Sequence, residues 1–241
     1  RIQGQKTDDE TWNEGLHIVF ATRSGIVKKS NLNDFKNIRK GGIIAIKIEE
    51  GDKLIDCKLT DGHNEIVLIT HEGMSIRFSE EEVKDQGRDT VGVWGIRPNK
   101  GDYIVGTAIV NKDAQLLVAG ENGLGKRTSF EEYRLQGRGG KGIITMKTND
   151  KTGAVAGALT VRDDDELMLI TNKGKMVRTR ISEIRETGRN AQGVKLLSMK
   201  EGESLQDISK VIPDGEDNGD SGDSDGESGA ATQCSPPSHD P

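Results

Sequence analysis

The chain has 241 residues, with 34 Lys and Arg against 40 Asp and Glu, which gives a formal net charge of −6. Apolar residues make up 32% and aromatic residues 3%, which suits a row of small cores better than one large core. The sequence contains no apolar stretch of membrane-spanning length and no signal peptide. Its two cysteines provide no disulfide framework, which fits a reducing cytosol.

The negative charge comes from the C-terminal end. From Pro213 onward there are eight acidic residues and no Lys or Arg, so the first 212 residues carry 34 basic and 32 acidic side chains, a charge of +2. Residues 213–241 are mainly Gly, Ser, Asp and Pro, with almost nothing to bury, and we expect them to be disordered. The body is therefore mildly basic, with an acidic tail beside it.

Taken in chain order, four similar units follow one another. Each has a short apolar run, a turn glycine, a basic pair, a connector and a second glycine before more apolar residues. The runs with their turn glycines are Ile18–Thr22 with Gly25, Ile66–Thr70 with Gly73, Leu116–Gly120 with Gly123, and Leu167–Thr171 with Gly174. The second glycines are Gly42, Gly92, Gly142 and Gly193. A constant period of about fifty residues indicates a repeat architecture.

The runs are short, β-branched and bounded by glycine, which favours strands. In the fourth unit, Glu166–Thr171 and Lys175–Thr179 predict a hairpin around Gly174. A connector over Ile181–Glu186 and two further strands, over Val194–Ser198 and Leu205–Ile208, complete the unit. About four strands per unit predicts an all-β, propeller-like fold.

The expected blades cover approximately residues 1–58, 59–108, 109–159 and 160–212, followed by the tail at 213–241. Residues 1–14 are interpreted as the remnant of an earlier unit. Because the chain begins with Arg1 instead of Met, we expect it to be part of a longer protein.

Three further positions recur in every unit. Ten residues after the turn glycine lies an apolar or aromatic residue, and directly after the second glycine lies a β-branched one; both are expected in the core. Nine residues after the turn glycine lies an acid, expected to cap the connector. These acids are Asp34, Glu82, Glu132 and Glu183.

Basic residues recur at two places in each unit. Because a charge is rarely buried without a partner, we expect them to point outward, along one rim, where they would bind DNA phosphates without sequence preference. The predicted DNA-binding residues are Lys28, Lys29, Arg39, Lys40, Arg77, Arg88, Lys126, Arg127, Arg138, Lys141, Arg178, Arg180 and Arg189. Lys47, Arg97 and Lys147 extend the pattern. A propeller that binds protein partners is the alternative.

Other motifs carry little weight. Gly120–Arg127 approaches a phosphate-binding loop, but it lacks the final Ser or Thr and falls in a predicted hairpin. Gly137–Gly142 matches a dinucleotide fingerprint by letters, but a strand follows it where a helix is required. The acids of 163–166 fit a solvated turn better than a cation site. We find no catalytic residues, no metal site and no cofactor site.

Several segments closely resemble blades of the C-terminal domain of the bacterial DNA gyrase A subunit. They are Ala21–Lys29, Asn122–Thr128, Val177–Arg180 and Gly188–Val194, and the likeness extends over roughly Gly15–Val211. The resemblance implies a β-pinwheel whose blades exchange strands and whose basic perimeter wraps duplex DNA. It also implies a role in ATP-dependent negative supercoiling by the bacterial, cytoplasmic, nucleoid-associated holoenzyme.

The resemblance also implies what the chain lacks. Family members have about six blades and a Gln-Arg-Arg-Gly-Gly-Lys-Gly box in the first; Gln136–Gly142 is a degenerate cousin in a later blade. The catalytic tyrosine and the ATPase, with its ATP and Mg²⁺, would lie elsewhere in the holoenzyme, as would the contacts with the gyrase B subunit or with a second copy of the A subunit. The equivalent domain of topoisomerase IV, whose blades are similar, remains an alternative. The tail is expected either to compete with DNA for the rim or to act only as a solubilising segment.

Overall fold

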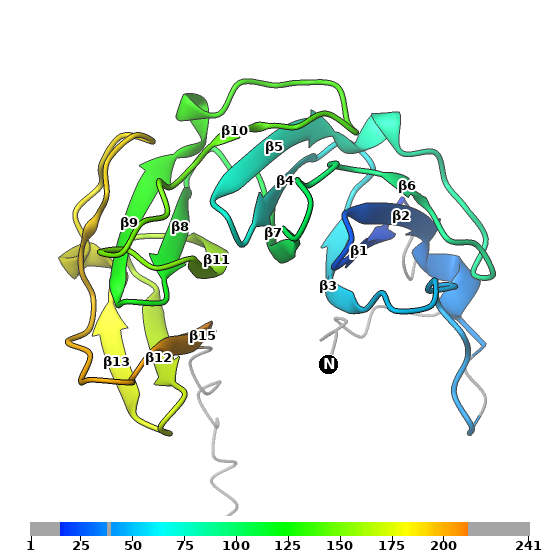
Figure 1. Cartoon of the computed structure of the whole chain (residues 1–241). Coiled ribbons are helices and arrows are strands. Elements are labelled where there is room, and N and C mark those ends of the chain that lie inside the picture. Colours follow the sequence, from blue (N-terminus) through cyan, green and yellow to red (C-terminus); the bar gives the residue numbers. More distant parts are fainter. Residues whose placement is uncertain (1–14, 38–39, 212–241) are drawn as a thin grey trace, which may run out of the picture. The chain divides into compact units, whose positions relative to one another are not determined.

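The computed structural model describes residues 15–37 and 40–211. The predictions for residues 1–14, for Arg39 and for the tail lie outside the described residues. The described chain folds into four antiparallel β-sheets, or blades, that follow one another around an open arc (Figure 1). The expected all-β, propeller-like architecture is therefore confirmed.

Each blade is built on a hairpin around a turn glycine. The first sheet has the order β3 (Leu54–Thr60), β1 (His17–Thr22), β2 (Ile26–Asn31) and β6 (Val93–Trp94). The second has the order β7 (Ile104–Ile109), β4 (Glu65–Thr70), β5 (Met74–Ser79) and β10 (Ile143–Ile144). The third has the order β11 (Val155–Val161), β8 (Gln115–Gly120), β9 (Leu124–Ser129) and β14 (Val194–Lys195). The fourth has the order β15 (Leu205–Val211), β12 (Glu166–Thr171) and β13 (Met176–Arg180).

The outermost strand of a blade comes from the following repeat. β6 follows the second hairpin but pairs with β2 of the first blade, where Val93 lies opposite Val27. β10 and β14 pair in the same way with β5 and β9. Gly142 enables this exchange: its φ is +76°, and a Cβ there would collide with the carbonyl oxygen of Ser75. Consecutive repeats are thus joined through their main chains.

Short 3₁₀ helices follow the hairpins: η1 (Leu32–Phe35), η2 (Glu80–Glu82), η3 (Phe130–Glu132) and η4 (Ile181–Glu183). The side chains of Asn31, Ser79 and Ser129 cap the first three. The expectation that the recurrent acids cap the connectors is therefore wrong. Glu82 instead accepts a hydrogen bond from the main-chain N–H of Arg138 in the next repeat, at 3.0 Å.

The core lies between neighbouring blades. On β4, Ile66 and Leu68 face the first blade, while Val67 and Ile69 face the third, and all four are fully buried. Because both faces of this strand are covered, the apolar run reads as continuous instead of alternating. The apolar position ten residues after the turn glycine is buried as expected in three repeats, at Val83, Tyr133 and Ile184, and half-buried at Phe35.

The inner strands β3, β7, β11 and β15 contact one another around the concave side of the arc, while β6 and β10 lie on its outer margin (Figure 1). Cys57 on β3 is exposed and forms no disulfide. No helix in the described part of the chain combines the length and apolar character needed to cross a membrane.

Candidate nucleic-acid interface

The basic residues three positions after the turn glycines are buried. Lys28 and Lys126 have no exposed surface. The Lys28 ammonium donates to the carbonyl oxygens of Ala45 (2.8 Å) and Arg88 (2.7 Å), and that of Lys126 donates to those of Gly188 and Arg189. Burial lowers the pKa of Lys28, and it lowers the pKa of Lys126 to about 8. The expectation that these two lysines point outward is wrong, because they tie the next repeat to the hairpin.

The basic residues one position further on are paired with carboxylates. Lys29 is nearly buried and lies 3.5 Å from Asp85. The other three ion pairs are Arg77 with Glu65, Arg127 with Asp163, and Arg178 with Glu166. The outward orientation expected for this row is wrong for Lys29, whereas the Arg178 side chain is 58% exposed. A carboxylate lies beside each of the four cations and offsets its charge.

Arg77 illustrates what this row does. Its guanidinium also donates to the carbonyl oxygens of Phe130 (2.6 Å) and Tyr133 (3.0 Å) in the third repeat. Arg127 similarly donates to the carbonyl oxygen of Ile184 in the fourth repeat. These arginines therefore satisfy main-chain acceptors at the following 3₁₀ helices, which is a structural use of the charge.

The arginines beside the second glycines have a different environment. Arg138 donates from Nε to the carbonyl oxygen of Glu82 (3.0 Å) and from Nη1 to that of Trp94 (3.2 Å). Arg189 donates to the carbonyl oxygen of Ile144. Within residues 15–37 and 40–211, the side chains of Arg88, Arg138 and Arg189 form no ion pair, and each is partly exposed. Neutral acceptors orient the guanidinium groups of Arg138 and Arg189 without cancelling their charge.

Further exposed cations lie close in sequence to the second glycines. Lys141 reaches the main-chain oxygen of Pro98 at 3.4 Å and remains exposed. Lys47, Arg97 and Lys147, each five residues after a second glycine, are also exposed. We call the set Lys47, Arg88, Arg97, Arg138, Lys141, Lys147 and Arg189 the outer row. Lys40 and Arg180, also predicted as DNA contacts, are exposed as well.

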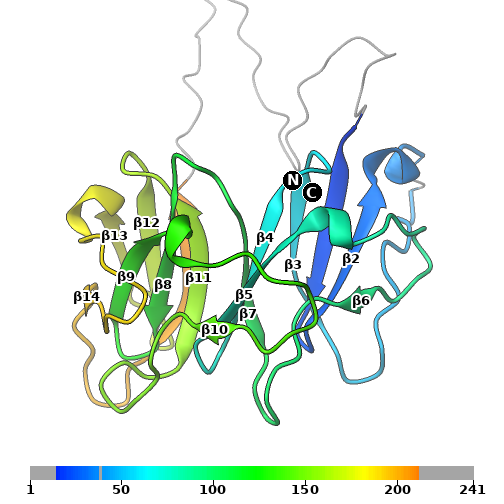
Figure 2. The ribbon, with the colours of Figure 1, turned by 90° about the horizontal axis from the view of Figure 1, so that it is seen from above.

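The strands beside the outer row are arranged in sequence along the molecule. Figure 2 shows β6, β10 and β14 following one another from right to left across three consecutive blades. The recurrence seen in the sequence therefore becomes a recurrence in space. A surface with regularly repeated, unneutralised cations can bind a polyanion of regular charge spacing.

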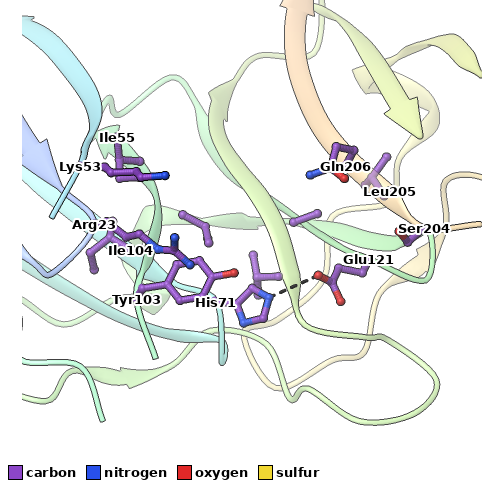
Figure 3. A pocket seen from close by; sticks show the side chains of 13 residues that line it. Arg23, Lys53, Ile55, His71, Tyr103, Ile104, Glu121, Ser204, Leu205 and Gln206 are labelled. Carbon is purple, nitrogen blue, oxygen red and sulfur yellow. Dashed lines mark hydrogen bonds and ion pairs between the residues drawn. The ribbon is translucent and has the colours of Figure 1, made fainter. Parts of the chain in front are cut away.

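A cavity of about 320 Å³ lies on the inner side, where sequence reasoning found nothing. The Arg23 guanidinium lies 3.8 Å above the ring of Tyr103, which stacks on His71 at 4.6 Å, and His71 Nε2 lies 3.3 Å from a carboxylate oxygen of Glu121 (Figure 3). Arg23, His71 and Glu121 each lie two residues before a turn glycine. This shared repeat position is the sequence signal that could have identified them as residues lining the cavity. The described residues contain no cluster of three metal-binding side chains.

Comparisons with known proteins agree with this architecture. The sequence profile described as "DNA gyrase C-terminal domain, beta-propeller" matches residues 16–61, 64–111, 114–162 and 165–212. The DNA gyrase A subunit of Escherichia coli strain K12 is 41% identical over 198 residues, which is 82% of this chain and 23% of that protein. The chain thus spans about a quarter of the length of such relatives.

Two solved structures are similar over most of the chain. The C-terminal domain of DNA topoisomerase IV superposes with a TM-score of 0.78 at 29% identity, covering 85% of this chain and 64% of that one. The DNA gyrase A C-terminal domain superposes with a TM-score of 0.74 at 28% identity, covering 86% and 68%. Since the profile matches all four repeats, the chain belongs to the family of DNA gyrase A C-terminal domains, with their β-pinwheel fold.

Proposed function

We propose that this chain binds duplex DNA without sequence preference along the outer row and bends it around the blades. The observation that carries the proposal is the contrast between two sets of cations. The cations three and four residues after the turn glycines are buried or paired with carboxylates. The side chains of Arg88, Arg138 and Arg189 are instead partly exposed, and they donate to neutral main-chain oxygens or to no acceptor. Positioned charges of this kind bind phosphates and carry no information on base sequence.

The wider role follows from the family. We infer that the chain is part of a DNA gyrase A subunit that presents wrapped DNA to the remainder of a type II topoisomerase, so that ATP hydrolysis drives negative supercoiling. Regions outside this chain would supply the strand-cleaving part and would contact the ATP-hydrolysing B subunit of gyrase as well as a second copy of the A subunit. The setting would be the nucleoid in a bacterial cytoplasm.

Salt dependence of DNA binding tests the outer row directly. Each phosphate contact contributes about 0.9 to the slope of log affinity against log salt. The double variant Arg138→Ala/Arg189→Ala should lower the slope by about 2 and weaken binding of every duplex sequence equally. Lys112→Ala is the matched control, because Lys112 is an exposed cation in the turn between β7 and β8, away from the outer row. An unchanged slope in the double variant would reject the outer row as the interface.

Ligation of nicked circles with the protein bound tests bending. Wrapping with a fixed hand changes the linking number of the closed product, whereas docking without wrapping leaves it unchanged. A topoisomerase IV-like domain, favoured by the TM-score of 0.78, would bind with the same salt slope but change the linking number little. Absence of DNA binding by the wild-type chain would overturn the proposal.

A further inference from the structure

Exposed apolar side chains recur at one repeat position, which lies on β6 and β10 in the second and third repeats. Two residues after the second glycine lie Ile44, Trp94 and Ile144, which expose 71%, 40% and 41% of their surface. The residues directly before the latter two, Val93 and Ile143, pack against the cores between blades. Because strand side chains alternate, burying one residue of the donated strand turns the next one outward.

The fold itself does not require an apolar group at this position. In the fourth repeat the equivalent residue is Lys195, and β14 pairs with β9 in the same register as the other donated strands. A single exposed apolar residue needs no explanation, but the same one in three of four repeats does. Since strand exchange tolerates lysine, pairing of the donated strand does not by itself account for the exposed apolar side chains of Trp94 and Ile144.

Cations flank Trp94 and Ile144. Arg138 donates to the carbonyl oxygen of Trp94, and the Arg97 guanidinium lies 5.9 Å from the centre of its ring. Around Ile144 the same arrangement recurs: Arg189 donates to its carbonyl oxygen, and exposed Lys147 follows three residues later. The side chains of Trp94 and Ile144 therefore lie among cations of the outer row and do not form a separate patch.

We propose that Trp94 and Ile144 contact the deoxyribose edges of the DNA duplex whose phosphates the flanking cations hold. The inference rests on the proposed function and adds an apolar, salt-independent component to it. The sugars that line the minor groove offer apolar surface between two rows of phosphates. A side chain wedged between base steps would bend the duplex toward the major groove, away from the protein. Contact with the sugars, without entry between bases, is the form that agrees with bending around the blades.

Removing the apolar group without changing charge tests the proposal. Trp94→Ser and Ile144→Ser should each weaken duplex binding about fivefold, the factor expected for losing about 1 kcal/mol of apolar contact. The loss should be the same at all salt concentrations, because no phosphate contact is removed. Leu59→Ser is the matched control: Leu59 is 44% exposed but lies on β3, at the inner side.

Three outcomes separate the two proposals. A wild-type chain that does not bind DNA refutes the proposed function. A wild-type chain that binds, together with serine variants of unchanged affinity, overturns the present inference and leaves the outer row intact; the apolar positions would then be free for a protein partner. A salt-independent loss in the serine variants, with no loss in Leu59→Ser, supports the inference.

Tryptophan fluorescence gives a second measurement, in which Trp94 and Ile144 are both kept and possible unfolding of the serine variants plays no part. With Trp12→Phe, Trp94 is the sole tryptophan of the chain. Its emission should shift to shorter wavelength on saturation with duplex DNA, because the sugars displace water from the indole. Emission that stays constant while binding reaches saturation would overturn the contact. Trp94→Lys, which copies the fourth repeat, serves as a variant that the fold accommodates and should raise the salt slope.

Discussion

The buried lysine of the third hairpin provides a test of the structure that is independent of DNA. Lys126 has no exposed surface, and its ammonium is held by the carbonyl oxygens of Gly188 and Arg189. Burial lowers its pKa from 10.5 to about 8. The unfolded chain therefore holds the proton more tightly than the folded chain, so protonation of this group favours unfolding.

The sign and the size of the effect follow from these two pKa values. Below pH 8 both states are protonated and the cost of burying the charge is complete. As pH rises from about 8 to 10.5, the folded state loses the proton first and its stability increases. Between pH 7 and 10 the free energy of unfolding should rise by about 2 kcal/mol through this group, after allowance for solvent screening.

Comparison with Lys126→Met isolates this contribution, because titration of all other groups cancels in the difference. We expect urea unfolding at pH 7, 8.5 and 10 to show a wild-type-minus-variant difference that rises by about 2 kcal/mol. Lys112→Met, which removes an exposed charge instead of a buried one, is the control measured in parallel. A difference for Lys126→Met that stays constant with pH would refute the buried position of the ammonium.

Three more perturbations probe other parts of the molecule. Arg77→Ala should lower the free energy of unfolding by about 2–3 kcal/mol, because the half-buried Glu65 carboxylate and two carbonyl oxygens lose their donor. The salt slope of DNA binding should stay unchanged, and a slope lowered by about one would place Arg77 in the DNA interface. Gly142→Ala should lower the free energy of unfolding in urea by about 2 kcal/mol or more, because φ is positive there and the added Cβ would meet the main chain of Ser75. Gly87→Ala is the control and should be nearly neutral, since the space around Gly87 is open. Equal effects of the two substitutions would contradict the described strand exchange. Deleting residues 214–241, which carry eight acids, should tighten DNA binding at low salt if the tail competes for the outer row, and unchanged affinity would exclude competition.

The sequence was informative where the signal repeats within one unit. The hairpin around Gly174, the connector beginning at Ile181 and the strand at Leu205 were all predicted, because each depends on local turn chemistry and short apolar runs. The all-β architecture followed from their period. Gly120–Arg127 was likewise expected in a hairpin, and it forms the end of β8, the turn and the start of β9.

The role of the turn cations could not be read in the same way. Lys126 binds carbonyl oxygens of residues 188 and 189, more than sixty positions along the chain. Nothing local distinguishes it from a surface lysine, although Ile76 and Val177 at the equivalent positions of two other repeats indicate a buried site. The acceptors are main-chain atoms, which leave no trace in the sequence. The same applies to Arg77, whose partners include two carbonyl oxygens of the next repeat.

The exchange of outer strands has a consequence for synthesis on the ribosome. β2 pairs with β6, so the first sheet lacks its last strand until Val93 and Trp94 have been translated, more than sixty residues after β2. At typical elongation rates this delay is roughly 3 to 13 s. During that interval the nascent chain presents an open strand edge, which the next repeat covers while opening its own. Maturation would thus advance one blade at a time, and a pause in translation would leave the most recently made edge available to neighbouring nascent chains.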